Sequence, residues 1–151
     1  MPLIKHKPSL YPNAEVLVSG TFNIMHAGHV QLLEFAAHYG RVTVGINGDE
    51  YMRVKYGDKA IPLLNRAYVL RSCRYVEEVV FFNEPDPSEL ILKLRPKYFV
   101  RGPDYTGVDL PELDALRSVG TTLIFHNGKK IHSSSAIVPS LEPELFEVLD
   151  L

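Results

Sequence analysis

His26 and His29 flank an Ala-Gly pair, and this spacing is the feature of the chain that most clearly suggests chemistry. Both lie in the segment GTFNIMHAGH (residues 20–29), between a short apolar run and a helical pattern. At a helix entry two imidazole N–H donors can point toward one anion, while Gly28 lets that anion approach the backbone and the helix dipole adds to the field. A lone histidine more often caps a helix or packs against a sheet, whereas this pair favours anion binding. Zinc binding is the weaker interpretation, because no cysteine or carboxylate cluster is nearby.

A run of three serines, Ser133, Ser134 and Ser135, is a second candidate for binding phosphate. Serine hydroxyls and free backbone N–H groups at a helix N-terminus form a cradle for phosphate. Ordinary helix capping is the alternative. The place of the run, after the last predicted strand, favours the phosphate site.

Cationic side chains follow the second predicted strand. Lys55 lies in MRVKYGDK (residues 52–59), a segment rich in cations and glycine that suits a mobile lid, with a solvated loop charge as the alternative. Arg66 and Arg74 lie on the next predicted helix, where surface ion pairs are the commoner fate of an arginine. We expect Arg66 to steady the loop.

The segment RGPDY (residues 101–105) follows another predicted strand. Gly102 would bring the backbone close to a ligand, Asp104 could accept hydrogen bonds, and Tyr105 could pack beside the ligand. A turn with an aspartate cap is the alternative interpretation.

Apolar runs and helical patterns alternate along the chain, which places these segments on one sheet. The patterns predict strands at 15–19, 41–46, 78–82, 98–101 and 121–126, and helices at 30–37, 64–75, 88–94 (with Asp86 or Ser88 near its cap) and 111–119. This order predicts an α/β fold, a Rossmann-like three-layer sandwich with a mainly five-stranded parallel sheet and helices on both faces. Ligands of such sheets bind at the carboxyl ends of the strands, where the segments above converge.

Composition narrows the class of protein. The 151 residues fit one domain, 15–151, after an N-terminal arm, 1–14, that lacks the apolar core of a signal peptide. A net charge of −2 argues against a protein that binds nucleic acid, and no apolar stretch predicts contact with a membrane. The single cysteine, Cys73, excludes an intramolecular disulfide and favours a reducing, cytoplasmic setting.

The segment GTFNIMHAGH resembles the signature of the cytidylyltransferase-like nucleotidyltransferase superfamily, a Gly-Thr-Phe-Asp stretch followed by His-x-Gly-His. Within this group the chain is most similar to the adenylyltransferase domain of bacterial ADP-heptose synthesis enzymes and to glycerol-3-phosphate cytidylyltransferase. The likeness runs from about Val16 to Val138. It implies a nucleotidyltransferase that joins a nucleoside triphosphate to a phosphorylated small molecule, and a homodimer with the histidine-bearing helix near the interface.

The resemblance also implies roles for individual residues. Residues 47–50 resemble the family's polar turn, Lys55 lies where these enzymes place a lysine that reaches both substrates' phosphates, and Arg74 matches a contact to the substrate phosphate. RGPDY looks like the Lys-Gly-Gly-Asp-Tyr segment of the heptose enzymes, and the serines resemble a helix start that holds the leaving pyrophosphate. The nucleotide-binding residues expected on this basis are Gly20, Thr21, Phe22, Gly28, Arg101, Gly102, Asp104, Tyr105, Ser133, Ser134 and Ser135.

The implied reaction is an in-line attack of a substrate phosphate oxygen on the α-phosphorus of the nucleotide, with pyrophosphate leaving. A phosphomonoester is largely dianionic above pH ~6, so no general base is needed. His26, His29 and Lys55 are the expected catalytic residues because they can neutralise developing negative charge. Mg²⁺ should bridge the triphosphate oxygens, and no protein metal ligand is expected.

Two departures from the resembled pattern bear on activity and specificity. Asn23 replaces the usual aspartate of the signature, although its amide can still hydrogen-bond. The arginine that cytidylyltransferases carry before the serine run is missing from residues 126–132, as it is in the heptose-type enzymes. We therefore favour adenylyl transfer to a heptose-1-phosphate-like acceptor.

Three alternatives stay open. They are cytidylyl transfer to glycerol 3-phosphate or a related alcohol phosphate, a nucleotide-binding module without turnover, and one domain of a two-enzyme system, since the heptose adenylyltransferase is often fused to a sugar kinase.

Overall fold

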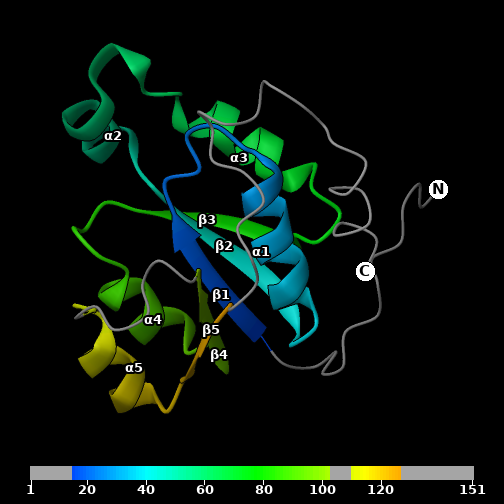
Figure 1. Cartoon of the computed structure of the whole chain (residues 1–151). Coiled ribbons are helices and arrows are strands. Elements are labelled where there is room, and N and C mark those ends of the chain that lie inside the picture. Colours follow the sequence, from blue (N-terminus) through cyan, green and yellow to red (C-terminus); the bar gives the residue numbers. More distant parts are fainter. Residues whose placement is uncertain (1–14, 103–109, 127–151) are drawn as a thin grey trace.

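Five parallel strands of the described chain form one sheet, in the order β3-β2-β1-β4-β5 (Figure 1). The computed structural model describes residues 15–102 and 110–126. The strands are β1 Glu15–Gly20, β2 Arg41–Asn47, β3 Glu78–Phe82, β4 Tyr98–Arg101 and β5 Thr122–Phe125. All five predicted strands are confirmed, and each observed end lies within about one residue of its prediction.

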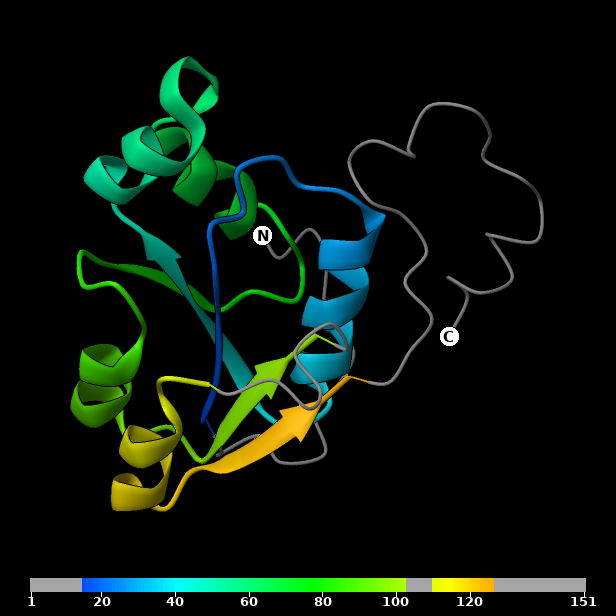
Figure 2. The same cartoon turned by 60° about the vertical axis from the view of Figure 1, so that its left-hand side comes forward.

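Helices cover both faces of this sheet. Successive residues of β1 point to opposite faces, so neighbouring residues of this strand pack in two different cores. Val16 and Val18 pack in one core with α1 (Ala27–Ala37) and α3 (Leu63–Arg71). Leu17 packs in a second core with α4 (Ser88–Leu94) and α5 (Leu113–Val119). Figure 2 shows the sheet between α1 on one side and α4 and α5 on the other. The predicted three-layer α/β sandwich is thus confirmed.

The strand order reverses between β1 and β4. The chain leaves β1 through α1 on one face and leaves β4 toward α5 on the other, so the two connections diverge at the carboxyl ends of these strands. Such a reversal is the place where open α/β sheets bind their ligands.

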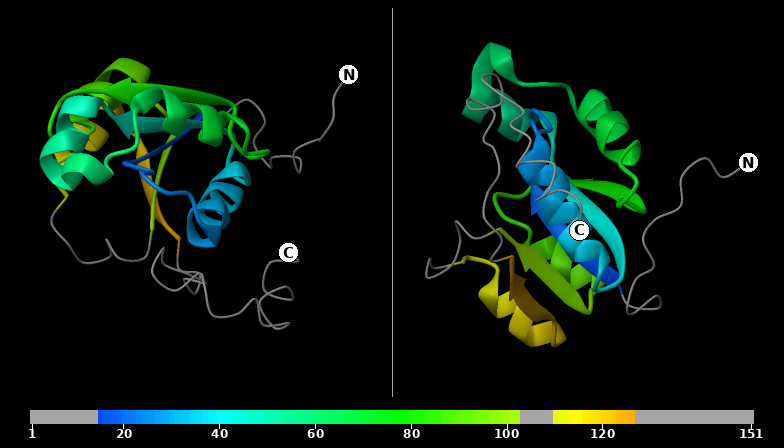
Figure 3. Two further views of the ribbon diagram at one scale, coloured as in Figure 1. Left: turned by 90° about the horizontal axis from the view of Figure 1, so that it is seen from above. Right: turned by 45° about the vertical axis from the view of Figure 1, so that its right-hand side comes forward.

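The segment after β2 is helical, which corrects the prediction of a loop around Lys55. Residues Asp49–Tyr56 form α2, followed by a 3₁₀ turn, η1, at Gly57–Lys59. Asp49 and Glu50 occupy the first turn and Arg53 and Lys55 the last, so the side-chain charges complement the helix dipole. Figure 3 shows α2 standing beyond the strand ends in two further views. Movement of this segment as a lid stays a prediction.

Helix α3 ends earlier than its apolar pattern predicts. It stops at Arg71, and the Ser72 hydroxyl donates to the carbonyl of Tyr68 at 2.9 Å. The chain then turns because Val76, which is 6% exposed, must enter the core before β3. Arg74, predicted to lie on the helix, therefore lies in the turn after it.

Two helix starts also differ from the predictions. Helix α1 begins at Ala27, so His29 lies inside its first turn. Helix α5 begins at Leu113, two residues beyond the predicted start. The N-cap residue of α4 is Pro87, and Asp86 beside it accepts from the backbone N–H of Ser88 at 2.8 Å, so the prediction that Asp86 or Ser88 lies near the cap is confirmed.

Candidate active site

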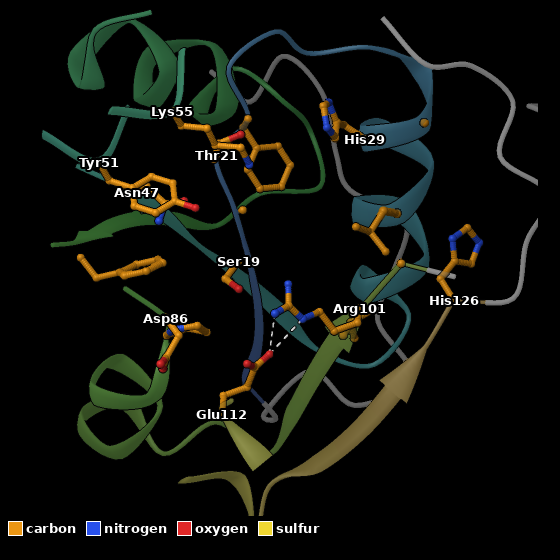
Figure 4. Close-up of a pocket in the computed structure, with 18 of the residues that line it drawn as sticks. Ser19, Thr21, His29, Asn47, Tyr51, Lys55, Asp86, Arg101, Glu112 and His126 are labelled. Carbon is orange, nitrogen blue, oxygen red and sulfur yellow. Dashed lines mark hydrogen bonds and ion pairs between the residues drawn. The ribbon is translucent and has the colours of Figure 1, made fainter. Parts of the chain in front are cut away.

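A cleft of about 450 Å³ opens at the carboxyl ends of the strands, where the strand order reverses. This volume is within the range of small-molecule sites. Figure 4 shows residues from the loop after β1, from α1, from α2 and from the segments around β4 facing one another across it. The lining includes, from the expected residues, Gly20, Thr21, Phe22, His26, Gly28, His29, Lys55, Arg101 and Gly102.

The two signature histidines lie together on the wall of the cleft. His26 is the N-cap residue of α1, and its carbonyl accepts from the backbone N–H of His29 at 3.0 Å. The rings stack with centroids 3.8 Å apart and planes inclined by 21°. Phe22 backs His29 at 4.9 Å between centroids and takes a positive φ of 47°, which is uncommon for a residue with a large side chain. The local structure therefore brings both imidazoles to one position beside the cleft.

Asn23 fastens the signature loop to the chain that follows η1. Its amide nitrogen donates to the carbonyl of Lys59 at 3.1 Å, and its amide oxygen accepts from the backbone N–H of Ile61 at 2.8 Å. One residue thus uses both a donor and an acceptor. An aspartate could make only the second contact, so the amide of Asn23 gives this loop a hydrogen bond that the usual aspartate would not.

Arg66 joins the same loop from α3. It is 1% exposed, and it donates to the carbonyls of Ile61 at 2.7 Å and Thr21 at 3.1 Å, with Asp49 Oδ1 at 3.4 Å. Burial lowers the pKa of Arg66, and the charge of Asp49 opposes that shift. Arg66 was expected to steady the segment around Lys55, and its contacts join both ends of that segment, at Asp49 and Ile61, to the signature loop at Thr21.

Lys55 projects from α2 at the mouth of the cleft. Its ammonium lies 5.4 Å from the ring centroid of Tyr56 and 6.0 Å from that of Tyr51, and all three residues line the cleft. The Tyr56 hydroxyl is 3.1 Å from the Thr21 hydroxyl, which links α2 directly to the signature loop. The cation is therefore held on the side of the cleft formed by β2 and α2.

A buried ion pair forms the opposite side of the cleft. Arg101, at the end of β4, donates from Nε at 3.1 Å and from Nη2 at 2.5 Å to Oε1 of Glu112, whose side chain is completely buried. Both residues line the cleft beside Gly102. Arg101 was expected from the sequence, whereas Glu112 was not.

Several other polar lining residues were also missed, among them Asn47, Tyr51, Asp86 and His126. Asn47 ends β2 and Asp86 precedes α4, so their positions after predicted strands were the available signal. His126 follows β5 and packs on Phe35 with ring centroids 4.5 Å apart, and burial lowers its pKa. The sequence predicted a parallel sheet but not its strand order, and only the folded chain brings these four residues to one cleft.

Some expected residues are not found at this cleft. Arg74 is exposed, with its guanidinium 5.3 Å above the ring of Tyr75, and it is not among the lining residues. Asp104, Tyr105, Ser133, Ser134 and Ser135 lie outside the described residues. Their roles therefore stay predictions.

Two negative findings concern the described residues alone. Within residues 15–102 and 110–126, no group of three or more His, Cys, Asp or Glu side chains is arranged to hold a metal ion. The helices in the same ranges are all too short or too polar to cross a membrane.

Fold and site together define the class of protein, a parallel α/β domain with paired histidines beside a ligand cleft at the reversal of its strand order. The chain belongs to the cytidylyltransferase-like family, whose model matches residues 17–137. This range nearly coincides with the likeness found in the sequence.

Curated relatives are similar over most of this chain. It is 39% identical over 131 residues to the bifunctional protein HldE of Campylobacter curvus, covering 84% of this chain and 27% of that protein. It is 38% identical over 113 residues to the D-beta-D-heptose 1-phosphate adenylyltransferase of Bordetella bronchiseptica, covering 72% of this chain and 70% of that protein. The chain thus spans about a quarter of the length of the bifunctional relative.

A solved structure supports the fold alone. The lipopolysaccharide core biosynthesis protein from Thermoplasma volcanium superposes with a TM-score of 0.65 at 20% identity, covering 77% of this chain and 98% of that one.

Proposed function

We propose that this chain is a nucleotidyltransferase that transfers an adenylyl group from ATP to the phosphate of a heptose-1-phosphate-like sugar, releasing pyrophosphate. The observation that carries the proposal is the stacked pair of His26 and His29 at the strand reversal of a cytidylyltransferase-like fold. The names of the relatives, which include a heptose 1-phosphate adenylyltransferase, support the choice of base and acceptor.

The mechanism needs charge neutralisation and alignment more than acid–base chemistry. An oxygen of the acceptor phosphate attacks the α-phosphorus, and the bond to the bridging oxygen of pyrophosphate breaks. His26 and His29 donate hydrogen bonds to the transferring group as its charge grows. Lys55, which lines the cleft from α2, draws the acceptor phosphate toward the nucleotide.

Magnesium enters this scheme as part of the substrate MgATP. Among the residues that the structure describes, Asp86 and Glu112 are the acidic side chains that line the cleft, and Oε1 of Glu112 is already bound to Arg101. Such a donor set suits a cation that is held mainly by triphosphate oxygens and water. When bound with the triphosphate, Mg²⁺ would supply charge neutralisation at the phosphates, and the protein would supply the histidines and the lysine.

The acceptor fits the half of the cleft formed by β2, α2 and the segment before α4. Asn47, Tyr51 and Asp86 line this half, and Figure 4 shows Tyr51 and Asn47 between Lys55 and Asp86. Amide, phenol and carboxylate groups can hydrogen-bond to the hydroxyls of a sugar, and Lys55 supplies the charge for its phosphate. A polyol phosphate therefore meets suitable partners along its length.

Pyrophosphate release measured with Mg²⁺ tests the proposal. ATP and CTP are each combined with heptose 1-phosphate, glycerol 3-phosphate and phosphocholine. We expect turnover with ATP and heptose 1-phosphate, and a loss of about two to three orders of magnitude in kcat for His29→Ala, because one donor to the transferring group is removed. Turnover only with CTP and glycerol 3-phosphate would replace this proposal by the cytidylyl alternative.

His38→Ala is the matched control. His38 follows α1, outside the cleft lining, and its ring nitrogen lies 2.9 Å from the carbonyl of Glu34. This variant should keep kcat within about twofold of the parent. If ATP binds but no combination releases pyrophosphate, the chain is a nucleotide-binding module instead.

A homodimer in the cytoplasm belongs to the same proposal. The family resemblance supports a homodimer with α1 near its interface, and the single cysteine of the chain suits a reducing compartment. Sedimentation velocity over a range of concentrations should give about twice the mass of one chain, and a single monomer peak throughout would contradict the dimer.

A further inference from the structure

Glu112 has a carboxylate oxygen for which the described structure provides no partner. The residue precedes α5 and is fully buried, and it lines the cleft. Its Oε1 accepts both hydrogen bonds from Arg101, whereas Oε2 is buried and has no hydrogen-bond partner within the described ranges. A buried carboxylate oxygen is rarely left unpaired, so a missing ligand is a direct explanation.

The position of Glu112 indicates which part of a ligand it meets. Arg101 and Glu112 lie on the β4 side of the strand reversal, and Lys55 lies on the β2 side. Figure 4 shows them on different sides of Ser19, which belongs to β1. If the phosphates are held by the histidines and Lys55, the nucleoside extends along the β4 side.

The chemistry of the unpaired oxygen restricts the ligand further. A carboxylate repels phosphate and accepts only from N–H or O–H donors. The nucleoside half of ATP offers such donors at the exocyclic amine of the base and at the two ribose hydroxyls. Arg101 holds the carboxylate in one orientation, so Oε2 is a fixed acceptor.

We propose that Oε2 of Glu112 accepts a hydrogen bond from an uncharged donor of the nucleoside, and that this contact selects the nucleotide. The inference rests on the proposed function, since it requires a nucleoside triphosphate in this cleft. Glu112 then separates bases with an exocyclic amine from those with a carbonyl at that position, or ribose from deoxyribose.

Calorimetric dissociation constants of the wild type and of Glu112→Gln test this contact. The probes are the magnesium complexes of ATP, ITP, 2′-deoxyATP, 3′-deoxyATP and inorganic tripolyphosphate. In the variant the amide oxygen stays on Arg101, so an NH₂ donor replaces Oε2 and opposes the nucleoside donor. We expect ATP to bind about ten- to a hundredfold more weakly and tripolyphosphate to bind unchanged.

Ratios of affinity within each protein show which donor is read. If the amine is bound, the wild-type preference for ATP over ITP disappears in Glu112→Gln while the deoxynucleotides keep their ratios. If a hydroxyl is bound, the preference over the matching deoxynucleotide disappears instead. If the pyrophosphate assay shows turnover with CTP instead of ATP, CTP and UTP replace ATP and ITP as probes. These two bases differ in the same way, by an exocyclic amine in one and a carbonyl in the other.

Asp114→Asn is the matched control, because it removes a carboxylate from the first turn of α5 at an exposed position. It should leave every ratio unchanged. The inference is overturned if Glu112→Gln weakens ATP and tripolyphosphate equally, or weakens neither. If Glu112→Gln fails to fold, the affinities of the wild type test the inference. Equal affinity of the wild type for ATP, ITP and both deoxynucleotides also overturns the inference.

Failure of the proposed function and failure of this inference alone give different results in the binding and turnover measurements. A wild type that binds neither nucleoside triphosphates nor tripolyphosphate removes the proposed function and this inference with it. A wild type that turns over ATP without selectivity for base or ribose removes the inference alone.

Discussion

His126 packs against Phe35 at the edge of the cleft, and burial lowers its pKa. The unfolded chain therefore takes up a proton on this ring at a higher pH than the folded chain does. The free energy of unfolding should fall as the pH drops below about 6.5, until the folded ring is protonated as well. At higher pH the ring is neutral in the folded and in the unfolded chain, so it adds nothing to the change of the free energy of unfolding with pH.

The variant His126→Phe keeps an aromatic ring but cannot titrate. Urea unfolding at several pH values between about 5 and 8 should show a shallower acid loss of stability for this variant than for the wild type. Comparing the two proteins removes the contributions of the other histidines. Equal slopes would contradict a buried, neutral His126.

Asn23 decides how the signature loop meets the segment after η1, so it acts at the scale of elements. In Asn23→Asp a carboxylate oxygen would face the carbonyl of Lys59, which now accepts from the amide nitrogen at 3.1 Å. We expect this change, toward the residue usual in the family, to lower kcat/KM about tenfold. The loop would still hold the backbone N–H of Ile61.

Asn65→Asp is a control for Asn23→Asp, since Asn65 is exposed on α3 and gains the same charge. Steady-state kinetics with ATP and the best acceptor provide the measurement. An Asn23→Asp enzyme as active as the wild type would show that the donor to Lys59 is unimportant.

Arg66 connects α3, the start of α2 and the signature loop. Replacing it with methionine keeps apolar bulk but leaves the partly buried carbonyls of Thr21 and Ile61 without this donor. We expect a loss of about 2 to 4 kcal/mol in the free energy of unfolding. Arg71→Met, at the exposed end of the same helix, should change it by less than about 0.5 kcal/mol.

Chemical denaturation of Arg66→Met and Arg71→Met measures the loss in the free energy of unfolding for each variant. A small effect at Arg66 would mean that water replaces its contacts in the folded protein. Its partner Asp49 is half exposed, so we expect the carbonyl contacts, rather than the ion pair, to carry most of the loss.

At the scale of the whole molecule, the cleft joins both halves of the sheet. Its walls come from β2 and α2 on one side and from β4 and the start of α5 on the other. A bound nucleotide should therefore stabilise the folded domain as a unit. With MgATP at about 100 times its Kd, the expected gain is roughly 2.7 kcal/mol, or about 5 to 10 °C in Tm.

Thermal unfolding with and without MgATP checks this expectation. His38→Ala should show the same rise, because it leaves the cleft intact. No rise in Tm at millimolar MgATP would contradict nucleotide binding by the domain.

Local patterns in the sequence were enough to predict the strands and the layers. β1 contains an apolar run that is buried on both faces, as in a parallel strand covered by helices, and the signature GTFNIMHAGH begins at its last residue. Hydrophobic periodicity depends on near neighbours in the chain, so it can be recognised without the fold. Family membership followed from the same short segment.

Only the tertiary structure decided what surrounds the signature. Asn23 meets Lys59 and Ile61, Arg66 meets Thr21, and Arg101 meets Glu112 through backbone turns that no local pattern specifies. The sequence alone determined the sheet, the paired histidines and the family. The position of α2 and the unpaired oxygen of Glu112 depended on the packed chain, because burial and hydrogen-bond partners arise from residues distant in sequence.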